Sequence, residues 1–341
     1  MQDAQKDIAS MLPDQLAAEL RELGQAPFRA KQVFDWLSKG TWDFSEMRNL
    51  PMELRGLLGE QFRLYAPQVL RKQVSQADGT VKYLWRLWDG NAVESVVMRY
   101  SYGNTVCISS QVGCRQGCVF CASTGLGFKR DLTAGEMLAE VLFSQIDSGL
   151  PISGIVLMGI GEPLENYEQV LRFLRLANHP QGMNIGMRHI SLSTCGLVPE
   201  IRRLAEENLQ LTLSVSLHAP DDETRRTIMP IARKYDMETL IDCCADYFRR
   251  TERRISFEYA LIKGLNDAPW QAEKLAAIMR RTHGHLNLIP LNRVEGSPLI
   301  PGDAKSFADM LKKLGVNVTV RRRLGADIDA ACGQLRRKEA T

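Results

Sequence analysis

The chain has 341 residues, of which 45% are hydrophobic and 24% charged, and its formal net charge is +3. This composition suits one large α/β domain with an appendage, and it excludes collagen-like, fibrous and disordered proteins. The opening residues lack the basic start and apolar stretch of a secretory signal, and no later apolar run approaches the length of a membrane span. We therefore expect a cytoplasmic protein without membrane contact. In that setting the eight unevenly spaced cysteines favour metal binding or catalysis over a disulfide scaffold.

The first 75 residues are predicted to be helical. Apolar residues recur at spacings of three and four over residues 11–24, 27–40 and 47–62, with Gly or Pro between these stretches. We treat residues 1–75 as an accessory domain, and either RNA contact or simple packing would explain it. The RNA reading depends on four basic residues, Arg29, Lys31, Lys39 and Arg55.

A β hairpin is predicted next. Residues 81–100 alternate between apolar and polar, and the pair Asp89-Gly90 separates two strand-like runs. We expect this hairpin, over residues 76–100, to lead into a catalytic domain that spans residues 76–341.

From Thr105 onward, seven short β runs alternate with amphipathic helical stretches. The first of these helices, predicted for residues 134–146, begins with a capping-box pattern made by Thr133 and Glu136. Strands separated by crossover helices imply a parallel sheet with right-handed connections, and a closed or partly closed barrel follows naturally. Unusual residues collect in the loops after the strands, where barrel enzymes carry their chemistry, so we expect one shared site.

The loop after the first of these strands carries Cys114, Cys118 and Cys121 in CxxxCxxC spacing. Three thiolates can hold three corners of an iron–sulfur cluster and leave the fourth iron open for a small molecule. A zinc site or three inert thiols is the alternative. Zinc sites usually need a fourth ligand, and no histidine lies near this loop, so the cluster is the favoured interpretation.

The loop after the second strand reads Gly-Ile-Gly-Glu-Pro, from Gly159 to Pro163. Gly161 would let the backbone approach a ligand closely, and Glu162 offers an acceptor for a cationic amino group, although a tight turn alone could explain the glycines. Residues at other strand ends are ordinary singly, but as a set they look like ribose and adenine contacts. Four are polar, Ser193, Ser216, His218 and Asn292, and the fifth is Leu217.

Positive charge gathers at the carboxyl end. From residue 321 on, the chain has six basic and three acidic residues. The basic ones are Arg321, Arg322, Arg323, Arg336, Arg337 and Lys338, and the acidic ones are Asp327, Asp329 and Glu339. Such a patch fits contact with nucleic-acid phosphates, and a solvated face is the plainer alternative.

These loops resemble those of the radical S-adenosylmethionine superfamily. The segments TVCISSQVGC, VESVVM and GADIDAACGQL are similar to the RlmN/Cfr family of radical S-adenosylmethionine RNA methyltransferases, over nearly the whole chain. The resemblance implies a partial (β/α)6-type barrel, a [4Fe-4S] cluster and two S-adenosylmethionine molecules per turnover. It also implies methylation of an adenine ring carbon. One departure is Arg323-Leu324-Gly325, where many RlmN sequences carry Thr-Arg-Gly.

The resemblance also assigns roles to residues outside the cysteine loop. Cys332, in the segment 321–341, matches the thiol that carries the methyl group, and Cys107 matches the thiol that resolves the RNA adduct through a transient disulfide. Glu94 matches the proton acceptor, although a solvent-facing strand carboxylate is the ordinary fate of such a residue. Cys195, Cys243 and Cys244 match no family role, and we interpret them as buried small residues.

The family's substrates become the expected partners of this chain. They are 23S rRNA at the peptidyl transferase centre, tRNA at the adenosine 3′ of the anticodon, and a flavodoxin-type reductant, with the enzyme acting as a monomer. Methylation at adenine C2, the RlmN outcome, is the favoured hypothesis, and C8, the Cfr outcome, stays open. A non-enzymatic iron–sulfur electron carrier or RNA-binding module is the alternative from a different class. A radical enzyme that activates another protein is a further one, but it would have no use for Cys107 and Cys332.

Overall fold

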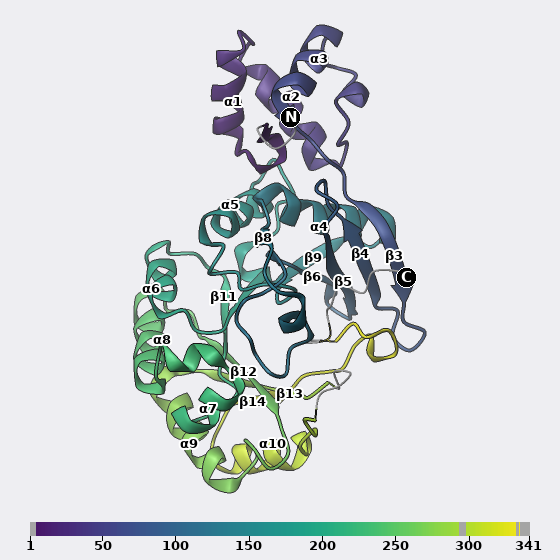
Figure 1. Ribbon diagram of the computed structural model, residues 1–341. Coiled ribbons are helices and arrows are strands. Elements are labelled where there is room, and N and C mark those ends of the chain that lie inside the picture. Colours follow the sequence, from purple (N-terminus) through teal and green to yellow (C-terminus); the bar gives the residue numbers. More distant parts are fainter. Residues whose placement is uncertain (1–4, 293–297, 332–333, 335–341) are drawn as a thin grey trace.

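The computed structural model describes residues 5–292, 298–331 and 334. These residues form a ten-stranded mixed sheet with the strand order β14-β13-β12-β11-β10-β9-β6-β5-β4-β3, and a helical module stands at one end of the molecule (Figure 1). No helix among them combines the length and apolar character needed to cross a membrane.

The parallel part of the sheet contains all seven predicted β runs. Helices cross over between each pair of consecutive strands and cover the outer face, so the predicted α/β class and partial (β/α)6-type barrel are confirmed (Figure 1). The strands are β6 (Gly103–Ile108), β9 (Ile152–Leu157), β10 (Ile190–Thr194), β11 (Thr212–Ser216), β12 (Ser256–Leu261), β13 (His285–Pro290) and β14 (Val318–Val320). The helices are α4 (Ala134–Ser148), α5 (Tyr167–Asn178), α6 (Val198–Glu206), α7 (Asp222–Ile228), α8 (Met237–Thr251), α9 (Pro269–Thr282) and α10 (Ala304–Lys313).

Alternation along the strands decides which side chains reach the barrel interior. In β10, Ile190 and Leu192 are fully buried, whereas Ser193 points the other way and lines an interior cavity. Because successive strand residues face opposite sides of a sheet, apolar residues pack under the helices while polar ones enter the barrel.

Three antiparallel strands extend the sheet beyond β6. The predicted hairpin is confirmed as β4 (Val81–Arg86) and β5 (Ala92–Tyr100), and β5 pairs with β6. The prediction of helix was wrong for the residues of β3 (Gln68–Val74), which pair with β4 at the sheet edge. Most of the residues of β3 are exposed, so its sequence lacks the apolar alternation that marks a half-buried strand.

The amino-terminal module contains the three predicted helices, α1 (Pro13–Glu22), α2 (Phe28–Ser38) and α3 (Met52–Gln61). Leu16, Phe34 and Leu54 are buried and belong to one core that continues into the barrel. A domain boundary at residue 75 remains a prediction. Residues 68–74, on the amino-terminal side of that boundary, pair with the barrel sheet.

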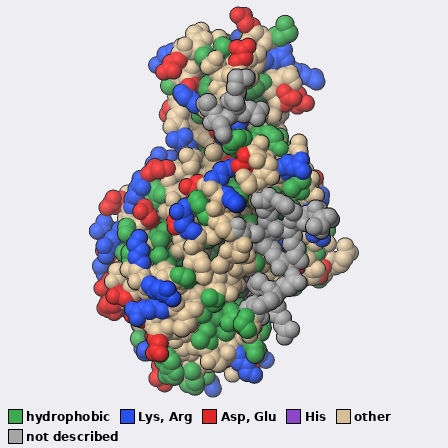
Figure 2. Space-filling model, in the orientation of Figure 1, with side chains coloured by type: hydrophobic (Ala, Val, Ile, Leu, Met, Phe, Trp, Pro, Cys, Tyr) green, Lys and Arg blue, Asp and Glu red, His purple; other side chains and the backbone are tan. Residues whose placement is uncertain are grey.

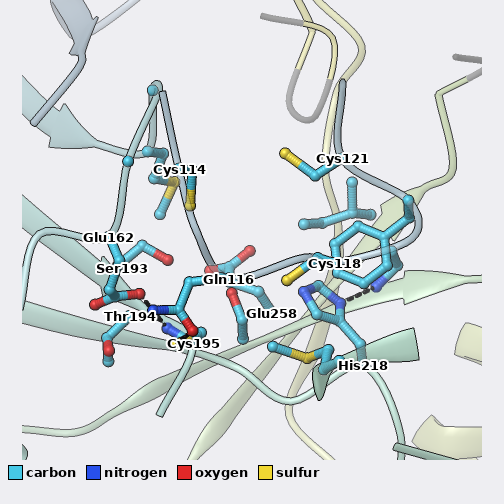
Figure 3. A pocket seen from close by; sticks show the side chains of 18 of the residues that line it. Cys114, Gln116, Cys118, Cys121, Glu162, Ser193, Thr194, Cys195, His218 and Glu258 are labelled. Atoms are coloured by element: carbon cyan, nitrogen blue, oxygen red, sulfur yellow. Dashed lines mark hydrogen bonds between the residues drawn. The ribbon is translucent and has the colours of Figure 1, made fainter. Parts of the chain in front are cut away.

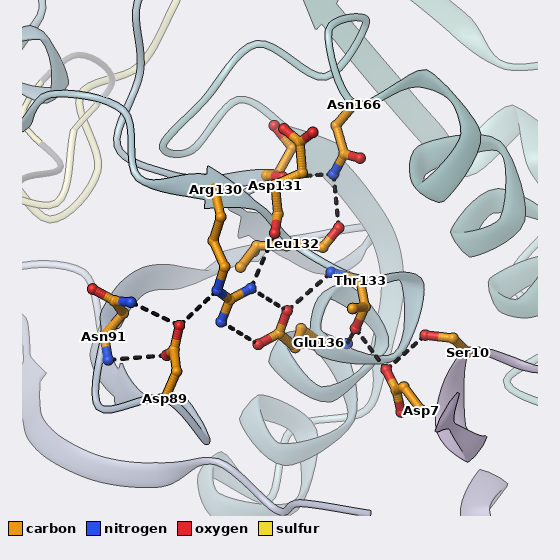
Figure 4. Close-up of polar contacts among 11 residues, drawn as sticks. Asp7, Ser10, Asp89, Asn91, Arg130, Asp131, Leu132, Thr133, Glu136 and Asn166 are labelled. Atoms are coloured by element: carbon orange, nitrogen blue, oxygen red, sulfur yellow. Dashed lines mark hydrogen bonds and ion pairs between the residues drawn. The ribbon is translucent and has the colours of Figure 1, made fainter. Parts of the chain in front are cut away.

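Hydrogen bonds at the start of α4 join the module to the barrel (Figure 4). The predicted capping box is present, with the Thr133 hydroxyl accepting the Glu136 N–H at 3.1 Å. The same hydroxyl donates to the carboxylate of Asp7 at 2.6 Å, and Ser10 donates to that carboxylate at 2.7 Å. Ser10 also accepts the N–H of Gly135 at 2.7 Å, so the first turn of α4 is bonded to the amino-terminal segment.

Thr133→Ala should destabilise the protein by about 1–2 kcal/mol, because it removes the helix cap and the bond to Asp7 together. Thermal unfolding followed by circular dichroism measures the effect. Thr133→Ser keeps the hydroxyl and should stay close to the parent protein. Thr227→Ala, which removes an exposed hydroxyl bonded only within its own turn, is the matched control. Equal melting temperatures for Thr133→Ala and Thr227→Ala would contradict this account.

Candidate active site

One cavity opens at the carboxyl ends of the parallel strands and contains about 950 Å3 of space, including its mouth. Figure 3 shows Glu162, Ser193 and Cys195 on one side of it and Cys118 and His218 on the other. The structure therefore brings together nine of the predicted site residues, namely Cys114, Cys118, Cys121, Gly161, Glu162, Ser193, Ser216, His218 and Asn292. Leu217 is fully buried and does not line the cavity.

The cysteine loop is closed at its base by a two-stranded ladder between β7 (Gln111–Val112) and β8 (Arg130–Asp131). The middle of the loop is bonded to the end of α7, where the Val119 N–H donates to the carbonyl of Ile228 at 3.1 Å. Burial raises the pKa of the Cys114 thiol to about 11 and raises that of Cys118 further. A bound metal would be needed to hold these groups as thiolates.

The three cysteines of the loop all line the cavity. Among the residues that the structure describes, no three donor side chains lie close enough together to hold one metal ion. A cubane cluster, however, offers a separate iron to each thiolate, so its ligands are spaced around the cluster. Cys114, Cys118 and Cys121 line the cavity at different points, and a cluster bound there would take one thiolate from each (Figure 3).

The turn after β9 is fixed by close backbone packing against the turn after β6. The Ile160 carbonyl accepts the N–H groups of Ser110 and Gln111 at 2.9 and 3.2 Å. A Cβ on Gly161, where φ is +111°, would lie 2.7 Å from the Gln111 side chain, and one on Gly159 would lie 2.5 Å from the Ile108 carbonyl oxygen. Both glycines are therefore required by the packing.

Glu162 is buried and held by backbone groups on both sides. Its carboxylate accepts the N–H of Cys195 at 2.7 Å and that of Leu164 at 3.1 Å, while its own N–H donates to the Gln111 side chain at 2.8 Å. Burial raises the pKa of this carboxyl group. A cationic ligand group would reverse that effect, which fits the predicted contact with an amino group.

His218 is a neutral histidine with a defined tautomer. Its Nδ1 accepts the N–H of Ala260 at 2.8 Å, so the ring proton sits on Nε2. Burial, aided by Arg225, lowers the pKa of His218 to about 3. The residue adopts a left-handed backbone with φ +54°, and the Asn266 amide donates to its carbonyl at 2.8 Å. This side chain can act as a fixed hydrogen-bond donor beside a bound ligand.

Cys107 lies in an adjoining pocket beneath the carboxyl-terminal segment. It is buried on β6 in a small apolar cluster with Val96, Met98, Ile160 and Ala330. Ala330 and Ala331 line the same pocket as Cys107. Cys332 itself lies outside the described residues, and the segment that leads to it reaches the Cys107 pocket.

Comparisons with known proteins agree with this geometry. Residues 108–276 match the radical SAM superfamily, and residues 6–64 match a ribosomal RNA large subunit methyltransferase N-terminal domain. A Clostridium tetani protein described as a probable dual-specificity RNA methyltransferase RlmN is 52% identical over 314 residues, which cover 91% of this chain and 90% of that protein. A Clostridium acetobutylicum protein of the same description is 52% identical over 317 residues, 92% of each chain.

A solved structure shows the same fold over the whole length. The crystal structure of a radical SAM methyltransferase from Sphaerobacter thermophilus has a TM-score of 0.92 and 41% sequence identity, covering 97% of this chain and 99% of that one. The chain belongs to the RlmN/Cfr family of radical S-adenosylmethionine RNA methyltransferases.

Membership in the RlmN/Cfr family implies a [4Fe-4S] cluster and S-adenosylmethionine as cofactors. The cavity fits both. It presents three spaced thiols for the cluster, and beside them a close-packed glycine turn and the buried carboxylate of Glu162 for the amino group of S-adenosylmethionine. Ser193, Ser216, His218 and Asn292 line the same cavity and would be near its sugar and base.

In this RlmN/Cfr family member, the β3–β4 turn anchors the carboxyl-terminal loop. Asp78 accepts the N–H of Gly325 at 2.9 Å, and the Ser75 hydroxyl donates to Asp327 at 2.7 Å. Lys82 donates to the carbonyl of Asp329 at 3.0 Å. The unpredicted edge strand β3 and its turn thus hold the loop that leads to Cys332.

Glu94 lies on the face of β5 that carries the Cys107 cluster. It is buried and pairs with the buried Lys82 at 3.0 Å, and it lines a small pocket with Ile328 and Asp329 of the carboxyl-terminal loop. Val96, two residues farther along the same face, pairs in register with Cys107. Glu94 therefore lies on the same face of the sheet as Cys107 and borders the carboxyl-terminal loop.

Several residues of the site were not predicted from sequence. Glu258 and Thr194 line the cavity, and Arg225 lies behind it and bonds to the strand ends. Cys195 is buried, as expected, yet its N–H holds Glu162 and its thiol reaches the cavity. Cys243 and Cys244 are buried, as predicted. The only sequence signal for Arg225 was its place on a polar helix, where arginines are usually exposed.

The free energy of unfolding should fall on acidification because of His218. Its pKa in the folded protein, about 3, lies below the ordinary value of about 6.5, so below pH 6.5 the unfolded chain binds a proton that the folded one does not. Between pH 7 and pH 5 this costs about 2 kcal/mol. His218→Asn suits the left-handed backbone and should lose that much less stability over the same range.

Urea unfolding of the cofactor-free protein at pH 7 and pH 5 measures this difference. His283→Asn is the matched control, since His283 is an exposed histidine with φ +50° at the end of α9. That variant should keep the acid sensitivity of the parent. If His218→Asn and His283→Asn respond equally to acid, His218 is not the buried neutral group described here.

Proposed function

We propose that the protein methylates C2 of adenine in 23S rRNA, at the peptidyl transferase centre, and in tRNA, at the adenosine 3′ of the anticodon. The observation that carries this proposal is the convergence of the Cys107 pocket, the loop leading to Cys332 and the three-cysteine cavity at one end of the barrel. The relatives described as dual-specificity RNA methyltransferases support the pair of RNA substrates.

Two thiols are needed because adenine C2 is electrophilic, as is the methyl group of a sulfonium, so direct transfer fails. When bound, the cluster and S-adenosylmethionine supply the methyl group and a 5′-deoxyadenosyl radical, with two S-adenosylmethionine molecules used per turnover. Cys332 would carry the methyl group as a thioether, which gives a hydrogen atom to the 5′-deoxyadenosyl radical and becomes bonded to the base through its carbon. The adduct would then return one electron to the cluster. Cys107 would then attack the Cys332 sulfur and form a disulfide, while the carbon–sulfur electron pair leaves with the methylene carbon, which takes up a proton to give methyladenine. An external two-electron reductant would reopen the disulfide.

Between these steps a proton must leave the ring carbon, and we assign its removal to Glu94. Its place on the Cys107 face of β5 and its contact pocket with Ile328 and Asp329 support the assignment. Lys82 orients the carboxylate from β4 and also holds the Asp329 carbonyl, so one side chain positions the base and the loop together.

The remaining parts of the chain have proposed roles as well. Residues 1–75 would act as an RNA-contacting accessory domain, supported by the match of residues 6–64 to an rRNA methyltransferase domain. Of the four basic residues, Arg29 and Arg55 donate to groups within the module and Lys31 pairs with Asp35, so packing accounts for part of their role. Figure 2 shows acidic and basic side chains interspersed over this module. We also propose that the protein is a cytoplasmic monomer that receives electrons from a flavodoxin-type reductant.

Nucleoside mass spectrometry of rRNA and tRNA, from cells with and without the gene, tests substrate and position together. We expect 2-methyladenosine in both RNAs only when the gene is present. Detection of 8-methyladenosine instead would assign the Cfr outcome. Unchanged RNA, together with a reduced cluster whose paramagnetic resonance does not respond to S-adenosylmethionine, would favour an electron carrier.

Replacement of each of the two thiols should have a different effect on the reaction in vitro. Cys332→Ala, with a reconstituted cluster, should form no methyladenine, because no side chain carries the methyl group. Cys107→Ala should instead accumulate protein covalently joined to RNA, visible as a nuclease-sensitive band on a denaturing gel. Cys243→Ala, which changes a buried thiol on α8, is the control and should turn over normally. Methylation by Cys332→Ala at the parent rate would show that the mechanism is wrong.

Glu94→Gln should slow release of methyladenine by about 10²–10⁴-fold, the usual contribution of a general base. Formation of 5′-deoxyadenosine should continue, since Glu94 acts after the radical step. Single-turnover assays that follow both products separate the two effects. Glu206→Gln, at an exposed position on α6, serves as control. If Glu94→Gln lowers both products equally, the carboxylate has a structural role only.

A further inference from the structure

Arg225, on α7, is a fully buried arginine behind the cofactor cavity. Its guanidinium donates to three carbonyl groups at the ends of β10 and β11: Nη2 to Cys195 at 2.7 Å and to Ser216 at 3.2 Å, and Nε to Leu217 at 3.1 Å. The side chain therefore fastens together the two strand ends that carry Ser193 and Ser216.

These hydrogen bonds go to neutral carbonyl groups, so they do not neutralise the charge of Arg225. No carboxylate pairs with it among the described residues, and its buried Nη1 has no hydrogen-bond partner there. Asp222, in the same helix, is engaged by the Met237 N–H at 2.9 Å. An unpaired buried charge costs several kcal/mol, and an arginine cannot lose its proton at physiological pH, so the site is incomplete without an anion.

The groups around Arg225 place that anion at the cysteine loop. Cys195, whose carbonyl accepts from Arg225 at 2.7 Å, donates its own thiol to the side chain of Gln116 in the cysteine loop at 3.3 Å. The helix that carries Arg225 ends at Ile228, whose carbonyl receives the N–H of Val119, the residue after Cys118. Pro230, two residues on, would lie 3.1 Å from a Cβ at Gly117. The cluster loop is therefore built directly onto the end of the helix that holds the cation.

We propose that Arg225 is the counter-cation of the iron–sulfur cluster, and that its fixed charge makes the cluster easier to reduce. The inference rests on the proposed binding of the cluster by Cys114, Cys118 and Cys121. Thiolates and sulfides give such a cluster a negative charge, which grows by one when an external one-electron donor reduces it. A nearby cation stabilises the reduced form more than the oxidised form, because net charge is one of the factors that set cluster potentials.

The test is a redox titration of the anaerobically reconstituted protein with dithionite and mediators, followed by electron paramagnetic resonance without S-adenosylmethionine. Arg225→Gln keeps hydrogen-bond donors and removes the charge. It should lower the ratio of reduced to oxidised cluster at a fixed potential about tenfold, which is a shift of about 59 mV to more negative potential for a one-electron couple. Arg225→Lys keeps the charge and should stay close to the parent.

Arg253→Gln is the matched control. Arg253 donates to the carbonyl of Leu211 at the opposite end of β11, far along the strand from the cysteine loop, so its loss should leave the potential unchanged. Cys244→Asp gives a second route to the same result. It places a carboxylate near Arg225 and cancels the charge while the three carbonyl bonds remain, so it should reproduce the shift even if Arg225→Gln does not fold.

The outcomes separate charge from structure. A folded Arg225→Gln protein that loses its iron, while Arg225→Lys retains it, also supports the proposal. Full iron content with unshifted potentials in Arg225→Gln and Cys244→Asp overturns it, and so does an equal shift in Arg225→Gln and Arg225→Lys, which would mean that only the carbonyl bonds matter. A parent protein that binds no cluster would instead refute the proposed cysteine site.

Discussion

The site depends on the backbone contact between the turn after β9 and the turn after β6. The Ile160 carbonyl bonds to Ser110 and Gln111, and Gly159 and Gly161 are packed so closely on this segment that a side chain at either would collide with it. This contact fixes the base of the cysteine loop relative to Glu162. Because Glu162 also binds the N–H of Cys195, the ends of β6, β9 and β10 become one rigid rim.

Regular alternation made most of the barrel predictable, and its absence explains what was missed. The seven parallel strands are short apolar runs between amphipathic helices, and the Thr133 cap is a local pattern, so both could be read from sequence. Strand β3 could not, because its residues are mostly exposed at a sheet edge, where no apolar face is needed. Its importance comes from the anchored loop, a contact between segments about 250 residues apart.

The site shows the same division between local and long-range information. The cysteine loop and the glycine turn could be recognised from sequence because the residues of each lie close together in the chain at a fixed spacing, which the geometry of a ligand site requires. Arg225 and Lys82 carry no such signal. Each is a buried cation whose partners come from other elements: backbone carbonyls of two strands for Arg225, and Glu94 with the Asp329 carbonyl for Lys82. Burial of a charge can be recognised only once the fold is known.

The cofactor cavity and the Cys107 pocket adjoin each other and share lining residues. Met158, Ile289, Asn292 and Arg321 line both, and Arg321 donates to the Met158 sulfur at 3.3 Å. In the proposed mechanism, the radical must be kept from other hydrogen donors, whereas the Cys107 sulfur must reach the sulfur of Cys332. The carboxyl-terminal loop is anchored by Asp78 and Lys82, and its residues Ala330 and Ala331 line the Cys107 pocket. These anchors hold the loop beside the side chains that the two spaces share, which is where the proposed mechanism needs the residue that follows Ala331.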